Sequence, residues 1–121
     1  NWLTNKYYEI LEKVKEYKEP NINFELLSIE LWDKSKTILI AGEIGYKIGS
    51  TYTSLTGFCL KDKKYNNFGK LQMVLLSLYL EKNNFSFWNL GHPYMQYKFD
   101  LGAITYKREA FLKRWLPSIL P

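Results

Sequence analysis

The segment that decides the fold runs from Leu27 to Leu60 and reads LSIELWDKSKTILIAGEIGYKIGSTYTSLTGFCL. Its first six residues alternate Leu27, Ile29 and Leu31 with more polar neighbours, which is the two-residue period of a strand. Two turn signals, residues 33–36 and 49–50, separate this strand from β-rich stretches at 37–48 and 51–60. The segment therefore predicts a three-strand antiparallel meander.

Apolar residues recur at helical spacing on both sides of the meander. Residues 5–18 predict an amphipathic helix with Thr4 as its N-cap, and residues 68–82 predict a helix that is largely buried. Beyond these, the pattern predicts a central strand at 85–90, a helix at 93–101, a short strand at 103–106 and a helix at 108–116, stopped by Pro117. The order predicts an α/β or α+β fold, with one mixed sheet packed against helices.

Composition excludes several classes of protein. The 121 residues are 46% hydrophobic and 17% aromatic, which predicts one folded domain over 1–121, with 1–24 as N-terminal helix and linker. Because Cys59 and His92 are the sole Cys and His, a disulfide within the chain and Cys- or His-rich metal sites are excluded, and we expect no metal. No apolar run approaches the roughly 20 residues of a membrane span, and no signal peptide is visible, so we expect a cytoplasmic protein without a membrane partner.

The net charge of +5 comes from 15 lysines and 2 arginines against 12 acidic residues. Such a lysine-rich composition is typical of an AT-rich genome, and it is also typical of a protein that binds a polyanion. Lysines gather before and at the start of the helix 68–82, where free N–H groups favour an anion. Asn67, Gly69 and Lys70 are therefore candidate residues for binding phosphate or a carboxylate, although a solvated lysine loop is the alternative.

Other single residues have a structural and a functional interpretation. Asn89 ends the predicted central strand, where ligands gather in open sheets, and its amide can orient an amine or a carbonyl. A strand-terminating Asn in a turn is the alternative. Cys59 is interpreted as a small buried apolar residue, His92 as a turn residue, and Trp32, Trp88 and Trp115 as core residues.

Several segments resemble, in order and spacing, the leucyl/phenylalanyl-tRNA–protein transferases. Residues 27–32 and 40–49 resemble the S-V-E-V/L-W … L-V-G-G-x-x-G-x-x-x-G stretch of that family. Lys70 and the helix after it resemble the A-S-K-x-A-L helix start of the family. Residues 85–89 stand where the family has G-F-x-x-x-D-x-Q. Residues 101–112 resemble its S-L-G-A-x-x-x-x-R-x-x-F/Y-L ending. The resemblance covers about residues 26–115 and indicates a divergent, eukaryotic-type C-terminal domain.

The resemblance implies a GNAT-like acyl-CoA N-acyltransferase fold, with a V-shaped splay between the fourth and fifth strands. It implies an aminoacyltransferase that moves Leu or Phe from aminoacyl-tRNA to the N-terminal amine of a protein, which marks that protein for degradation through the N-degron route. The partners are aminoacyl-tRNA and an acceptor protein N-terminus, and no cofactor is needed. Because the chain begins at Asn1 and not at Met, we expect the family's N-terminal domain upstream of it.

The same resemblance implies roles for individual residues. Asn89 orients the attacking amine, and Lys70 with the helix start faces phosphate or the terminal nucleotide. The acyl side-chain pocket lies beside Trp88 and is lined by Tyr52, Thr53, Ser54, Thr56 and Phe58.

The chain departs from the family at the residues credited with activating the amine. The Glu of the family's G-E-S-M-F-S is Leu55 here, its D-x-Q is Asn89-Leu90-Gly91, and the His before its S-L-G-A is Tyr97. The familiar general-base arrangement therefore does not carry over. Orientation of an activated ester beside an amine supplies a large share of the rate by itself, so we expect transfer that is weaker than the family norm.

Two alternatives remain. One is an acyl-CoA-dependent N-acetyltransferase on the same fold, with acetyl-CoA as donor and its pyrophosphate at Gly69 and Lys70. The other is a catalytically inactive module that recognises a protein N-terminus or RNA.

Overall fold

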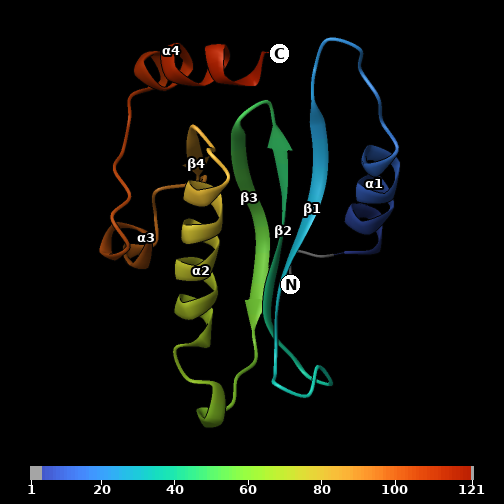
Figure 1. The fold of residues 1–121 in the computed structure, drawn as a ribbon, viewed down its shortest axis with the longest axis vertical. Helices are drawn as coiled ribbons and strands as arrows, with labels where there is room; N and C mark the ends of the chain where they lie inside the picture. Colours follow the sequence, from blue (N-terminus) through green and yellow to red (C-terminus); the bar gives the residue numbers. More distant parts are fainter. Residues whose placement is uncertain (1–3, 121) are drawn as a thin grey trace.

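The computed structural model describes residues 4–120 (Figure 1). Its elements are α1 (Asn5–Lys15), β1 (Phe24–Trp32), β2 (Leu39–Ile48), β3 (Thr51–Cys59), the 3-10 turn η1 (Lys63–Tyr65), α2 (Phe68–Lys82), β4 (Phe87–Asn89), α3 (Gln96–Asp100) and α4 (Arg108–Ile119). The strands pair in the order β1-β2-β3-β4, the first three antiparallel and β4 parallel to β3. The predicted meander and the mixed sheet flanked by helices are confirmed. No helix within these residues has the length and apolar character needed to cross a membrane.

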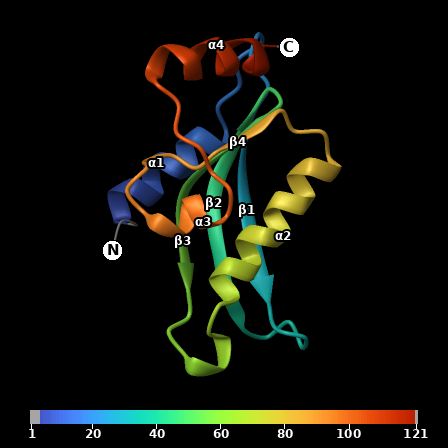
Figure 2. The ribbon, with the colours of Figure 1, turned by 90° about the vertical axis from the view of Figure 1, so that its left-hand side faces the viewer.

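The helices lie on different sides of this sheet. Figure 2 shows α2 along one face, α1 on the opposite side and α4 across one end of the strands. The core lies under α2, where Tyr52, Leu76 and Leu80 are buried together. α4 is anchored at the β2–β3 turn, where the backbone N–H of Ser50 donates to the carbonyl oxygen of Ser118 at 2.8 Å.

The C-terminal part differs from the sequence prediction. Residues 103–106 form no strand, since Ile104 is 70% exposed and nothing pairs with this segment. Within residues 4–120 the sheet ends at β4, so the expected splay toward a fifth strand has no counterpart. The helix predicted at 93–101 is reduced to α3. Pro117 does not stop α4, which continues to Ile119; the ring removes the N–H that would bond the carbonyl of Lys113, and the Ser118 hydroxyl donates to the next carbonyl, that of Arg114, at 2.9 Å.

Two burial predictions were wrong. α2 buries one side only, through Gln72, Leu76 and Leu80, because a single helix layer on one sheet face has one side to cover. Its outer side exposes apolar residues: Leu71, Val74, Leu75, Leu78 and Tyr79. Trp32 is 43% exposed at the irregular end of the edge strand β1, where its indole N–H donates to Glu30 at 2.9 Å.

Asp33 organises the turn between β1 and β2, and its hydrogen bonds predict how the stability of this turn depends on pH. The Ser35 hydroxyl donates to its carboxylate at 2.6 Å and the backbone N–H of Ile38 donates at 2.9 Å. These hydrogen bonds, that from Ser35 first, lower the pKa of Asp33 to about 2. Because this pKa is lowered on folding, the carboxylate stabilises the turn above about pH 4 and the contribution is lost as the pH falls through about 2.

We expect an NMR titration of the Asp33 carboxyl carbon to show a midpoint near 2. Ser35→Ala should move this midpoint upward, because it removes the hydrogen bond with the largest effect on the pKa. A midpoint near 4 in the native chain, the ordinary value of about 3.9, would show that the turn does not hold the carboxylate.

Candidate functional site

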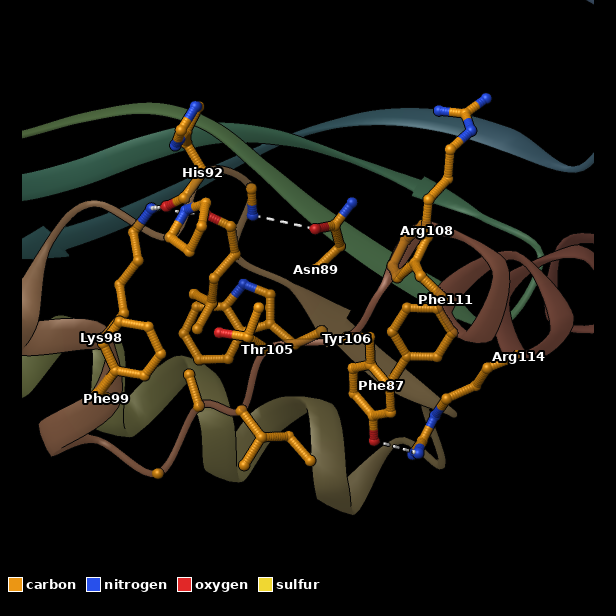
Figure 3. Close-up of a pocket in the computed structure, with 17 residues that line it drawn as sticks. Phe87, Asn89, His92, Lys98, Phe99, Thr105, Tyr106, Arg108, Phe111 and Arg114 are labelled. Carbon is orange, nitrogen blue, oxygen red and sulfur yellow. Dashed lines mark hydrogen bonds between the residues drawn. The ribbon is translucent and has the colours of Figure 1, made fainter.

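A groove of about 930 Å³ opens beside β4. Its wall is formed by β4, the turn 90–93, the segment 102–106 and the first turns of α4, together with Lys98 and Phe99 from α3. Figure 3 shows Phe99 and Lys98 at one end of the groove and Phe87, Phe111 and Arg114 at the other, with Asn89 between them. The groove therefore joins residues of β4 to a C-terminal segment that follows it in sequence.

The charge in this groove has one sign. Lys98, Arg108 and Arg114 line it, and no Asp or Glu of the described chain does. Aromatic side chains make much of the remaining wall: Phe87, Trp88, Phe99, Tyr106 and Phe111. A cationic groove with aromatic walls suits an anionic ligand that carries flat rings.

The three cationic groups are held to different degrees. Lys98 Nζ donates to the carbonyl oxygens of Leu90 at 2.9 Å and His92 at 2.7 Å, which fixes the turn after β4. Arg114 donates to the Tyr106 hydroxyl at 2.8 Å. Its guanidinium lies 5.6 Å from the ring centroids of Phe87 and Tyr106, which leaves most of its N–H groups for a ligand.

Arg108 is exposed, and within residues 4–120 it makes no hydrogen bond or ion pair. Figure 3 shows its side chain extending away from the ring group of Phe87 and Phe111. A guanidinium without a partner at the mouth of a groove is available to an anionic ligand.

Asn89 lies where the parallel pairing of β3 and β4 ends, opposite Thr53. Its Oδ1 accepts the backbone N–H of Gly91 at 2.9 Å, and one lone pair of that oxygen stays free. Asn89 thus ends a strand as predicted, but β4 is the edge strand of the sheet and not the predicted central one, and the hydrogen bond to Gly91 is the turn contact of the alternative interpretation.

A buried carboxylate, which the sequence reasoning missed, lies between the sheet and α2. Glu43 is 7% exposed and accepts hydrogen bonds from Ser54 Oγ at 2.6 Å, Tyr52 Oη at 2.7 Å and Gln72 Nε2 at 3.2 Å. No cation of the described residues forms an ion pair with it. An isolated charged residue inside an otherwise apolar strand, Ile40 to Ile44, was the signal that could have identified it.

The carboxylate is linked to the groove through Ser54 and Trp88. The indole N–H of Trp88 donates to Ser54 Oγ at 2.9 Å, and Trp88 also lines the groove. Burial first, and then the negative charge of Glu43, raise the pKa of both Tyr52 and Tyr97. Tyr97, from α3, is thus near enough to sense the charge of Glu43.

The sheet register divides the six residues predicted to line one acyl pocket. Ser54 pairs with Gly45, but Thr56 pairs with Ile44, because Leu55 is an extra residue at a bulge. Ser54 and Thr56 therefore face opposite sides of the sheet. Tyr52, Ser54 and Trp88 lie together on the α2 side, whereas Thr53, Thr56 and Phe58 face the other side.

The predicted phosphate residues lie at the other end of the molecule from the groove. A Cβ added at Gly69 would lie 3.4 Å from Cys59 Cβ, which places the start of α2 beside the last residue of β3. Thr53, which pairs with Asn89, is about 20 Å away along β3 at the usual strand rise. Asn67 precedes α2 with φ 68° and makes no side-chain cap, and Lys70 is exposed. Asn67, Gly69 and Lys70 thus do not share a site with Asn89.

Within residues 4–120, no three His, Cys, Asp or Glu side chains are grouped so that they could hold a metal ion. No family model, curated protein or solved structure matches this chain.

Proposed function

We propose that this chain is an aminoacyltransferase that moves an amino acid, Leu or Phe, from aminoacyl-tRNA to the N-terminal amine of a protein. The observation that carries the proposal is the groove beside β4, in which three cationic side chains and several aromatic rings meet no acidic side chain. A GNAT-like fold, an N-degron role and a cytoplasmic location are parts of the same proposal.

The groove suits the nucleotide end of the donor better than it suits the acceptor. The single-stranded end of a tRNA carries phosphates, which pair with guanidinium groups, and bases, which stack on aromatic rings. A protein N-terminus that begins with Lys or Arg is repelled by Lys98, Arg108 and Arg114. The acceptor therefore approaches from the side of Ser54, beyond the short pairing of β3 with β4.

The reaction is the aminolysis of an ester. The amine nitrogen attacks the ester carbonyl, a C–N bond forms, the C–O bond to the ribose breaks, and the proton lost by the amine ends on the ribose oxygen. Asn89 pairs with Thr53 and therefore lies on the sheet face opposite Ser54, so its side-chain N–H groups orient the carbonyl of the ester in the groove, not an amine held at Ser54. Holding both reactants at the end of β4 supplies a large part of the rate.

A transfer assay with labelled donors tests the proposal. The full-length protein is incubated with Leu-tRNA, Phe-tRNA or acetyl-CoA and with peptides that begin with Lys or Arg, and a peptide with an acetylated N-terminus serves as the control. We expect labelled product from the tRNA donors and none from the blocked peptide. Product from acetyl-CoA alone would identify an acyl-CoA-dependent enzyme instead, and binding of RNA or peptide without product would identify a binding module.

A further inference from the structure

We propose that Ser54 and Glu43 form a proton relay for this transfer, with Ser54 in contact with the attacking amine and Glu43 acting through Ser54 as its positioning residue. The inference rests on the proposed function and deepens it, because it supplies a route for the proton in a chain that lacks the family's acidic residue at Leu55.

The first support is the free-energy cost of burying the Glu43 carboxylate. A buried carboxylate without a cation is unfavourable, and three hydrogen bonds offset this cost only in part. The neighbouring positions Ile40 and Ala41 of the same strand are buried and apolar, as a purely structural strand would have them. A buried charged residue is rare in a core, so Glu43 calls for a role beyond packing.

The second support is the direction of the hydrogen bonds at Ser54. Its hydroxyl donates to Glu43 Oε2 at 2.6 Å and accepts the indole N–H of Trp88 at 2.9 Å. A hydroxyl oxygen has two acceptor positions, so one remains for an incoming N–H group. The network therefore orients the Ser54 proton toward the carboxylate and leaves a lone pair for the amine.

The third support is the position of Ser54. Pairing between β3 and β4 ends at Thr53 and Asn89, so Ser54 is the first β3 residue beyond it and is half-buried. Trp88, which donates to Ser54, also lines the groove proposed for the donor. An ester placed in the groove and an amine placed at Ser54 thus meet at the end of β4.

The relay balances without a further reactant. As the amine attacks the ester, its proton moves to Ser54 Oγ while the Ser54 proton moves to Glu43. When the C–O bond to the ribose breaks, the same path returns a proton to the ribose oxygen. Glu43 ends the cycle ionised, as it began.

The groups around Glu43 make a pH profile informative. Tyr52 from β3 and Tyr97 from α3 are the titratable groups that sense its charge, and the pKa of each is raised, so both stay neutral through the assay range. Gln72 from α2 and Ile29, opposite Glu43 in β1, carry no charge. A change in the pH profile that depends on the residue at 43 therefore reports proton transfer through that residue.

The test compares E43Q with a matched carboxylate elsewhere in the sheet. Glu30 also accepts from a serine, Ser28 at 2.6 Å, and from an indole, Trp32 at 2.9 Å, but it is exposed at the edge strand β1. Steady-state transfer from Leu-tRNA to a Lys-starting peptide is measured against pH for the native chain, E43Q and E30Q. We expect E43Q to lower kcat by about tenfold to a hundredfold, with KM for tRNA unchanged, and to change the shape of the pH profile. E30Q should match the native chain.

A second variant, S54A, keeps the Glu43 carboxylate with two of its hydrogen-bond donors, Tyr52 and Gln72. It should show the same loss of kcat and the same altered pH profile as E43Q. Circular dichroism distinguishes unfolding from lost chemistry. If the native chain transfers and neither E43Q nor S54A alters the rate or the pH profile, the relay is overturned while the proposed function stands. If the native full-length protein transfers from no tRNA, the proposed function fails and the relay fails with it.

Discussion

Replacing Tyr52 by Ala is expected to lower the free energy of unfolding by about 4 to 5 kcal/mol, a large part of the stability of a domain of this size. Tyr52 is fully buried at the centre of the core under α2, so truncation leaves a cavity next to Leu76 and Leu80. The same change removes the hydroxyl that donates to Glu43 at 2.7 Å, which leaves a buried carboxylate with one hydrogen bond fewer.

Tyr52→Phe separates these two contributions, because it keeps the ring and removes the hydroxyl. We expect a loss of about 2 kcal/mol for this variant, the typical cost of removing a hydrogen bond to a buried charged group. Urea unfolding followed by far-UV circular dichroism measures both values. Tyr94, which is 85% exposed, provides the control, and Tyr94→Ala should be neutral. A loss for Tyr52→Phe as small as that for Tyr94→Ala would show that the hydroxyl does not stabilise Glu43.

Reversing two charges in the groove is expected to abolish donor binding under ordinary conditions. The double variant Arg108→Glu, Arg114→Glu should raise the Kd for aminoacyl-tRNA by about a hundredfold to ten-thousandfold, since each charge-assisted contact contributes about 1.5–3 kcal/mol. The slope of log Kd against log salt should also become shallower, because fewer phosphates are neutralised. Filter binding at several salt concentrations measures both quantities.

The matched control uses the same helix. Lys107 precedes α4 and Lys113 lies within it, and neither lines the groove. The double variant Lys107→Glu, Lys113→Glu therefore changes the net charge by the same amount as the groove variant. We expect this control to raise the Kd only severalfold. If the two double variants weaken binding to the same extent, the tRNA contacts a diffuse positive surface and the groove has no special part in holding it. Because Arg114 also contacts Tyr106, circular dichroism of each variant must match that of the native chain.

Local sequence pattern was sufficient for most of the fold. Alternation at 27–32 and turn residues at 49–50 predicted the meander, and helical spacing at 68–82 predicted α2 with its observed bounds. These features depend on near neighbours in the chain, which is why they are readable without a structure. The segment 103–106 failed for the converse reason: pairing with the open edge of β4 depends on where the chain carries this segment, and here it lines the groove instead.

The sequence by itself determined most of the elements and their order, the strand end at Asn89, and the presence of Leu55 where the family has an acidic residue. Only the tertiary structure decided which residues meet. The bulge at Leu55 turns Thr56 away from Ser54, because one extra residue reverses the side-chain alternation of a strand. Packing of α2 on the sheet brings Gln72 to Glu43, and packing of α4 beside β4 brings Arg114 to Phe87. Such contacts join residues far apart in the chain, and no local periodicity encodes them.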